Sequence, residues 1–429
     1  MEINQEMSLE TEIPFQSVTD LRLHWEVGQH ATMGLYGGSK SSCQGSEWER
    51  DHCGSMIKLL FHGGDGRSQE DILFHGVVQA VDLIKDNGIG EARVQATSAS
   101  VFFDKKDDTL CRAFTDPDQS YQQVARQIVG QRSGSVICTI GQEKIKRPLI
   151  CYRETPWGFL KRIASHHAGH LIPDIKTGRP AIWFGMRKGK LVEEEIRSSD
   201  LGVEIKKTYT GSGKGVGKKI YRWTSRHSYL LGDIVRLDGM RYIIWAMDAV
   251  FRGGELLFTY KLAEEAGIQT PISYNESFTG MSLWGKVEEV RDEKVRVTFD
   301  FDPEKGKYFY PWMPETGNAS YAVPEVGARV AVYFKDHDER EGIAVRCMVQ
   351  TERQEKPEEK LLRSPDGSIV MMTDHHLKMQ AAEEMMRMMD HSKIDIKGDR
   401  IEVDAAGKIR IKAERISLSG ALGIRGTAG

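Results

Sequence analysis

Pairs of apolar residues separated by one polar residue recur along the C-terminal end of this chain, and this repeat constrains its fold most strongly. The first members of successive pairs lie seven or eight residues apart. Such a unit has room for one short strand and one tight turn, and Gly398, Gly407 and Gly420 lie in or near the turn positions. The apolar positions are Ile394, Ile396, Ile401, Val403, Ile409, Ile411, Ile416, Leu418 and Ile424.

A repeat this short cannot close a β-solenoid within one chain, because one coil needs about 20 residues or more. Three chains can close it if each contributes one face of a prism. The inward apolar residues then fill a common axis, and every strand edge is paired. We therefore predict that residues 363–429 form an intertwined triple-stranded β-helix, folded only as a homotrimer with these apolar residues on its axis.

The methionine-rich residues 378–390 (KMQAAEEMMRMMD) lie where this prism would begin. Their composition is helical, but their position in the chain favours strands. The sequence leaves both structures open.

Composition excludes several classes of protein. Of 429 residues, 59 are Lys or Arg and 62 are Asp or Glu, so no net positive charge favours nucleic acid or anionic lipid. With 43 Gly and only 13 Pro, the chain is expected to be mainly β with a few helices.

The six cysteines show no C-x-x-C pair and are expected to be buried free thiols. The acidic N-terminus lacks the pattern of a signal peptide, so we expect cytoplasmic synthesis and assembly.

Alternating apolar and polar residues predict short strands before the prism, at 21–25, 57–61, 72–81, 92–97, 136–140, 181–184, 242–246 and 256–260. Asn87 and Gly88 favour a turn between two of them. Two helices are expected within this region. One begins at the cap Asp116 with Pro117 and runs to about Gly130, and the other begins at Thr155 with Pro156 and ends at a Gly169 cap. Four further short strands at 282–350 suit a small OB-like barrel, and 351–360 is a charged linker.

Motifs that carry chemistry are weak. His166 and His170 have zinc-ligand spacing, but the Glu of H-E-x-x-H is absent and Gly169 interrupts the helix. Residues 211–219 (GSGKGVGKK) fail the phosphate-loop pattern, which leaves a basic hairpin or a contact loop for an acidic protein. The groups Cys43, His52, Cys53 and Asp374, His375, His376 are weaker still. We predict no catalytic residue, no cofactor and no metal site.

Three stretches resemble the VgrG family and the phage hub and spike proteins of contractile injection systems. Residues 152–164 (YRETPWGFLKRIA) are similar to a run in the family's hub domain. The resemblance rests on Tyr152, Glu154, Trp157, Phe159, Leu160 and Arg162. The second stretch is similar to the spike's OB barrel through Trp284, Gly285, Trp312, Pro324 and Gly327. The third is the terminal repeat, which looks like the family's β-prism.

The resemblance implies six segments. These are a hub β-barrel domain at 1–110, a helix and strand insertion at 111–185, a second hub β-barrel domain at 186–278, an OB-fold at 279–350, a linker at 351–362 and the trimeric β-helix at 363–429. It also implies a structural role. A homotrimer caps the inner tube and pierces a target envelope when a sheath contracts, in a phage tail, a tailocin or an extracellular injection system.

The partners implied are tube or tube-initiator proteins above the hub, baseplate wedge proteins and a separate PAAR-type tip protein, since the chain has no H-x-H tip of its own. Nucleic acid and stable membrane anchoring are not expected. Two alternatives stay open, a hub-fused cell-wall hydrolase and a trimeric adhesin. No length is left over for a hydrolase domain, and an adhesin needs export.

Overall fold

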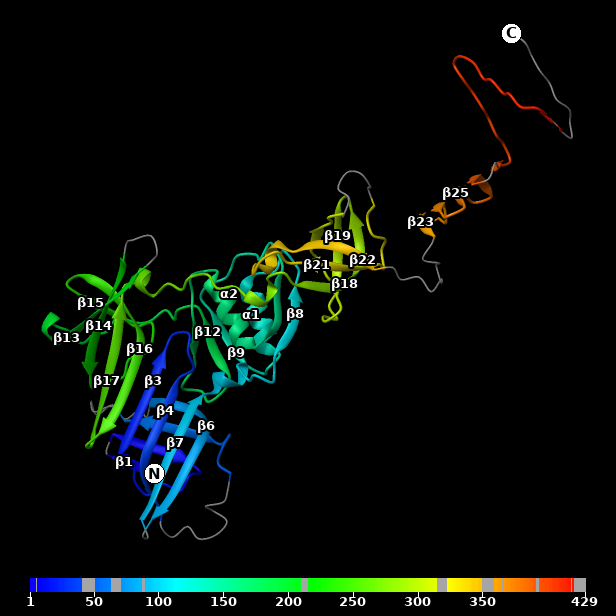
Figure 1. Ribbon diagram of the computed structural model, residues 1–429. Coiled ribbons are helices and arrows are strands. Elements are labelled where there is room, and N and C mark those ends of the chain that lie inside the picture. The colour runs from blue at the N-terminus through cyan, green and yellow to red at the C-terminus, as the bar shows by residue number, and fades with distance from the viewer. Residues whose placement is uncertain are drawn as a thin grey trace. The chain divides into compact units, whose positions relative to one another are not determined.

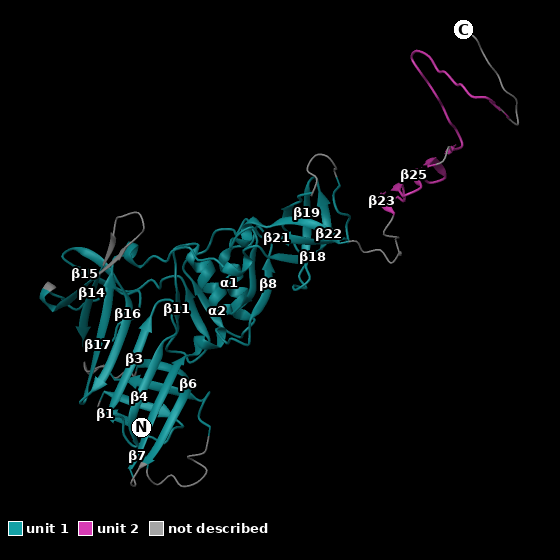
Figure 2. Cartoon of the chain, viewed as in Figure 1, with its two compact units in different colours: residues 1–349 teal, residues 350–429 magenta. Residues whose placement is uncertain are grey.

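A computed structural model describes most of the chain, and its residues divide into two compact units, 1–349 and 350–429 (Figure 2). Strands are the main regular structure of both units, with two α-helices among the described residues, which confirms the mainly β class. The described residues are 1–4, 6–40, 51–62, 71–86, 89–209, 215–314, 322–348, 359–364, 366–390, 393–417 and 419. No helix among them is long and apolar enough to cross a membrane.

The first unit is organised by a large, mostly antiparallel sheet of twelve strands (Figure 1). Its order is β1-β2-β5-β6-β7-β4-β3-β16-β17-β14-β13, and β15 pairs with β16. The strands alternate buried and exposed residues as the sequence predicts. They are β1 (Glu2–Asn4), β2 (Met7–Thr11), β3 (Asp20–Glu26), β4 (Thr32–Ser39), β5 (Met56–Phe61), β6 (Asp71–Asp86), β7 (Ile89–Ser98), β13 (Leu201–Tyr209), β14 (Gly215–Ser225), β15 (Ile234–Leu237), β16 (Met240–Arg252) and β17 (Glu255–Ala263).

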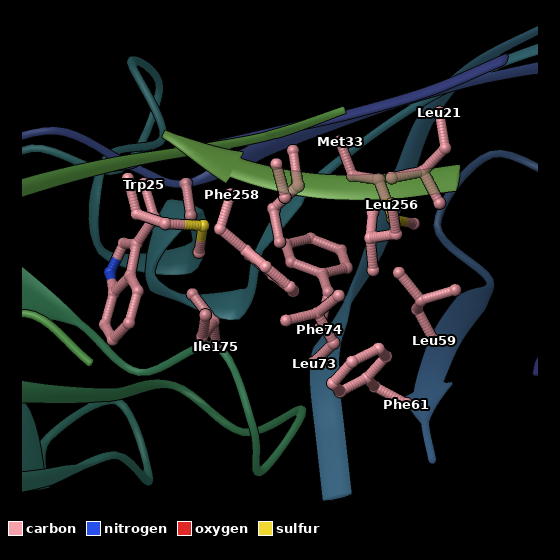
Figure 3. Close-up of a cluster of buried hydrophobic side chains, with 14 of the residues drawn as sticks. Leu21, Trp25, Met33, Leu59, Phe61, Leu73, Phe74, Ile175, Leu256 and Phe258 are labelled. Atoms are coloured by element: carbon pink, nitrogen blue, oxygen red, sulfur yellow. The ribbon is translucent and has the colours of Figure 1, made fainter. Parts of the chain in front are cut away.

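This sheet joins segments that are far apart in the sequence. Strand β3 pairs with β16 along its whole length, so strands from the first 100 residues and from residues beyond 200 share one hydrogen-bonded sheet. They also share a core, in which Leu21 and Trp25 lie with Leu256 and Phe258 (Figure 3). The proposed division of this region into hub domains at 1–110 and 186–278 stays a prediction. The Asn87-Gly88 turn lies outside the described residues.

Two α-helices, five short strands and one short 3-10 helix lie in the sequence between the two halves of the sheet. Strand β8 pairs with β10, and β12 pairs with β11 and, in parallel, with β9. Around the helices a second core forms, which includes Phe159 and Leu160. The elements are η2 (Ala99–Phe103), β8 (Leu110–Phe114), α1 (Tyr121–Gly130), β9 (Ser135–Cys138), β10 (Leu149–Glu154), α2 (Pro156–Ser165), β11 (Leu171–Pro173) and β12 (Ala181–Phe184).

The helix ends correct two predictions. Helix α1 begins after Ser120, not after Asp116, because Ser120 and Gln123 form a reciprocal capping box. Helix α2 begins after Thr155 as predicted, but its C-cap is His166, and the left-handed residue that follows is Ala168 rather than Gly169. A Cβ at Gly169 would lie 2.2 Å from the Ile140 Cδ1 atom, so that side chain would have to move to admit one.

The OB-like barrel is a five-stranded sheet of order β20-β19-β18-β21-β22. An isolated bridge between Trp312 and Ala344 links the region after β20 to β22, so the two edge strands are tied together. The elements from residue 198 to the end of this unit that are not yet named are η3 (Ser198–Asp200), η4 (Glu265–Ile268), η5 (Glu276–Phe278), β18 (Ser282–Arg291), β19 (Lys294–Phe299), β20 (Phe309–Pro311), β21 (Arg329–Tyr333), η7 (Glu339–Glu341) and β22 (Ile343–Met348).

The second unit is an antiparallel meander of five short strands. The methionine-rich stretch forms two of these strands, which settles the helix-or-strand alternative in favour of strands. Within the described residues beyond β27, no strand is assigned in the single chain. The strands are β23 (Lys360–Arg363), β24 (Ile369–Met372), β25 (His376–Ala381), β26 (Glu384–Met389) and β27 (Lys393–Lys397).

Candidate functional site

Residues 152–164, which we call the hub motif, lie on β10 and α2. A capping residue and a proline fix the start of the helix. The Thr155 hydroxyl accepts a hydrogen bond from the Gly158 backbone at 3.1 Å, and Pro156 occupies the first helical turn. This start places Phe159 and Leu160 in full burial and leaves Trp157 only 5% exposed. The Trp157 ring lies 4.2 Å from the His30 ring, centroid to centroid, so α2 also contacts the segment between β3 and β4.

Arg162 is the most buried charge of the motif, with 3% of its side chain exposed. It donates two hydrogen bonds to Glu154, from Nε at 2.9 Å and from Nη2 at 2.7 Å. Its Nη1 donates to Glu339 at 2.5 Å, and Nη2 also donates to the Ile150 carbonyl at 2.9 Å. The bidentate geometry suits a guanidinium and not an ammonium, so lysine cannot replace this residue without loss.

Glu339 contacts Arg162 from the OB-like barrel, where it is the first residue of the short helix η7. Its side chain is fully buried, and burial raises its pKa although Arg162 opposes the rise. Burial also disfavours the Arg162 cation, but the charges of Glu339 and Glu154 outweigh it and raise the Arg162 pKa. The charged pair therefore joins the hub motif to a loop of the barrel 177 residues further along the chain.

Further polar contacts surround this joint. The Asp302 carboxylate accepts a hydrogen bond from the Ala113 backbone at 2.6 Å and lies 3.3 Å from Arg112 Nε. Lys307 donates to Asp116 at 2.7 Å. Apolar packing adds to these contacts, because Ile150 is fully buried in the core of the barrel. We define Arg162, Glu154, Glu339 and Asp302 as the hub joint.

The residues that carry the resemblance to the OB barrel have separate structural roles. Gly285 is required for space, because a Cβ there would lie 2.5 Å from the Thr298 carbonyl oxygen. Gly327 has a positive φ of 94° and donates its backbone hydrogen to Val287 at 2.8 Å. Pro324 is buried beside this turn. Trp312 Nε1 donates to the Ala322 carbonyl at 2.8 Å, and Trp284 lies half-buried on β18 under Arg329.

The second unit presents one strand face that is almost wholly apolar. The registers of β23 to β27 place these side chains on the same face, because residues paired directly across strands point the same way. Only Lys360 and Glu384, at the ends of the strands, interrupt it, and the small Ala381 also lies on it. We call it the apolar face, and it comprises Leu362, Val370, Met372, Leu377, Met379, Met386, Met388, Ile394 and Ile396.

The opposite face of the same strands carries most of the charge. Arg387 donates to Asp395 at 3.0 Å, and Lys393 lies 3.0 Å from the same carboxylate. Asp395 is half-buried, whereas Met372 and Ile394 on the apolar face are 51% and 67% exposed. A single chain thus exposes most of its apolar face while Arg387 and Asp395 on the opposite face are half-buried, which is unusual for a stable monomeric sheet.

Two of the predicted axis residues lie where a strand is assigned, and their place on a trimer axis stays a prediction. Ile394 and Ile396 lie on β27 as part of the apolar face. The others follow β27 and are exposed by half or more in the single chain, and Leu418 lies outside the described residues. The exposed residues are Ile401, Val403, Ile409, Ile411 and Ile416. The methionines of the apolar face were missed from sequence, although their alternation along 377–379 and 386–388 signals a strand.

The candidate metal-binding residues are engaged elsewhere. His166 Nδ1 lies 3.3 Å from the Tyr121 hydroxyl, and burial, with help from Arg340 and Arg162, lowers the His166 pKa to about 4. His170 lies 2.7 Å from the Thr270 hydroxyl through its Nδ1. Among the described residues no group of three His, Cys, Asp or Glu is placed to hold a metal ion.

Two other predictions have mixed outcomes. The expectation of buried thiols is wrong for Cys53 and Cys347, which are exposed, and right for Cys151, whose pKa burial raises; Cys43 lies outside the described residues. Strands β13 and β14, at 201–209 and 215–225, pair antiparallel as the hairpin alternative predicts, and residues 210–214 lie outside the described residues.

Comparison with solved structures gives the fold a context. No protein-family model and no curated protein matches the chain. A chain of the Francisella PdpA-VgrG complex superposes with a TM-score of 0.58 at 8% identity, covering 92% of this chain and 89% of that one. The E. coli c3393 protein, described as a type VI secretion component similar to phage T4 tail proteins gp27 and gp5, superposes with a TM-score of 0.52 at 12% identity, covering 79% of this chain and 99% of that one. The chain has the fold of the VgrG-like hub and spike proteins that its sequence resembles.

Proposed function

We propose that this chain is the central hub and spike of a contractile injection machine, a phage tail, tailocin or extracellular injection system, and that it acts as a homotrimer. The first unit caps the inner tube, and the second unit forms the piercing rod. Its work is mechanical, so no residue performs bond chemistry. The likeness in fold to VgrG supports this proposal.

The observation that carries the proposal is the apolar face of the second unit. In this proposal, two further copies of the same chain pack against the apolar face. The apolar repeat continues past β27 at the same spacing, so each copy offers its neighbours an identical and continuous strip. Trimerisation buries Ile394 and Ile396 together with the methionines and leaves the charged face in water.

The partners follow from the same role. We propose tube or tube-initiator proteins above the hub, wedge proteins around it and a separate PAAR-type protein at the C-terminal tip. Assembly takes place in the cytoplasm, and the chain acts outside the cell as part of a particle.

Two adjacent residues of β27 test the proposal. Ile396 belongs to the apolar face and Lys397 to the opposite face, and both are exposed in the single chain. Ile396→Asp places three carboxylates in the axis and is expected to abolish the trimer in native mass spectrometry, whereas Lys397→Asp leaves it intact. In the producing strain, released particles with Ile396→Asp are expected to lose activity against target cells. A trimer that tolerates Ile396→Asp as well as Lys397→Asp contradicts the proposal.

A further inference from the structure

Methionine is concentrated in the second unit. Seven of the 17 methionines of the chain lie between residues 371 and 389. Four belong to the apolar face and three to the opposite face, and Met379 pairs directly with Met386 across β25 and β26. The four on the apolar face are Met372, Met379, Met386 and Met388, which are 51%, 50%, 44% and 45% exposed in the single chain.

We propose that these four methionines are an oxidation site whose modification blocks assembly of the spike. The inference rests on the proposed trimer, because the apolar face must become dry for the modification to matter. The substrate class is a peroxide. The thioether sulfur attacks one peroxide oxygen, the O–O bond breaks, an S–O bond forms, and methionine loses two electrons while hydrogen peroxide is reduced to water.

The sulfoxide is incompatible with the apolar face because its oxygen is a strong hydrogen-bond acceptor. The registers place Met386 between Met379 and Ile396, and Met388 between Leu377 and Ile394. None of these neighbouring side chains donates a hydrogen bond. A sulfoxide at these positions is therefore buried without a partner once three chains meet.

The location of the four methionines also makes their oxidation depend on whether the trimer has formed. Before assembly the four sulfurs lie on an exposed face, and after assembly they lie in a dry axis that excludes peroxide. The predicted axis beyond β27 consists of Ile, Val and Leu, whose hydrocarbon side chains hydrogen peroxide does not oxidise. Sensitivity to peroxide is thus confined to the first strands of the rod. Methionine sulfoxide reductases can reverse the oxidation.

The test treats the full chain with hydrogen peroxide in native buffer, diluted until it is monomeric, so that the buried Met7, Met33 and Met247 of the first unit stay protected. The chain is then concentrated, and native mass spectrometry measures the trimer yield. The yield of oxidised wild type is expected to fall at least about tenfold and to recover after treatment with methionine sulfoxide reductases. Replacing the four methionines (Met372→Leu, Met379→Leu, Met386→Leu and Met388→Leu) leaves the others oxidisable and is expected to keep the loss within about twofold. The matched variant of the opposite face (Met371→Leu, Met385→Leu and Met389→Leu) is expected to behave as wild type.

A second measurement follows protection in the assembled trimer by peptide mass spectrometry. Met240, a hub residue that is 52% exposed, serves as the internal reference. The four methionines are expected to oxidise at least about tenfold more slowly than Met240 in the trimer. Oxidised wild type that assembles as well as untreated chain overturns the inference alone. Untreated chain that stays monomeric overturns the proposed function instead.

Discussion

Arg162 shows how one residue connects two parts of the molecule. Its guanidinium holds Glu154, two residues before its own helix, and Glu339 in the barrel, and both partners are largely buried. A buried ion pair gives little net stability compared with apolar residues of the same shape, but removal of one partner is costly. The hub joint therefore specifies the arrangement of the two elements more than it stabilises them.

Substitution of Arg162 tests the joint. Arg162→Met leaves two buried carboxylates without a cation and is expected to lower the free energy of unfolding by about 3–5 kcal/mol. Arg162→Met combined with Glu339→Gln removes one of those charges, so it is expected to recover part of the loss. Denaturant unfolding of the full chain, followed by tryptophan fluorescence, measures both. If the free energy of unfolding of Arg162→Met lies within about 0.5 kcal/mol of the wild-type value, the joint is not buried as described.

His166 gives the first unit an acid-sensitive element. Its pKa falls from 6.5 to about 4 on folding, so the unfolded chain binds a proton between these values that the folded chain does not. Stability from this residue is complete above pH 6.5 and is lost as the pH falls towards 4, by roughly 2–3 kcal/mol. His166→Gln is expected to flatten the stability profile between pH 7 and 4 in thermal melts. His227→Gln, at an exposed histidine, serves as the control, and equal slopes for both variants contradict this role.

Trp157 is the third test at this scale. It is nearly fully buried between the α2 core and His30, so Trp157→Ala is expected to cost about 3–5 kcal/mol of stability. An unchanged melting temperature contradicts that placement.

At the scale of elements, sequence reasoning succeeds where the signal is local. The Thr155-Pro156 start of α2 and the strands at 21–25 and 256–260 depend on neighbouring residues alone, and all are confirmed. The start of α1 was wrong because Asp116-Pro117 and Ser120-Gln123 both carry cap signals, and the reciprocal box forms at the second.

Long-range contacts were beyond sequence reasoning for a physical reason. The pairing of β3 with β16 and of Arg162 with Glu339 depends on tertiary packing between residues about 180 to 230 positions apart, and no local pattern encodes such partners. The methionine-rich strands were left open because methionine favours helix by propensity, whereas the meander is decided by cross-strand pairing.

The repeat beyond β27 allows a test at adjacent positions. Ile411 is 74% exposed in the single chain and is expected to lie on the trimer axis, with Arg410 on the outside. Ile411→Asp is expected to cost several kcal/mol in each chain and to prevent trimer formation in sedimentation velocity. Arg410→Asp is expected to leave the trimer intact. Equal behaviour of the two variants contradicts an inward-facing Ile411.

At the scale of the whole molecule, the two units differ in how they are stabilised. The first has continuous buried cores within a single chain, including one shared by β3 and β17. The second has a largely exposed apolar face within a single chain, which the proposed trimer would bury. This contrast suits a hub that folds first and a rod that forms on assembly.

The mass of the purified full-length chain in solution is the most direct measurement of this difference. Sedimentation equilibrium is expected to give three times the 48.4 kDa chain mass, with residues 394–416 protected from proteolysis. A stable particle of 48.4 kDa in which the same residues resist proteolysis contradicts the proposed spike.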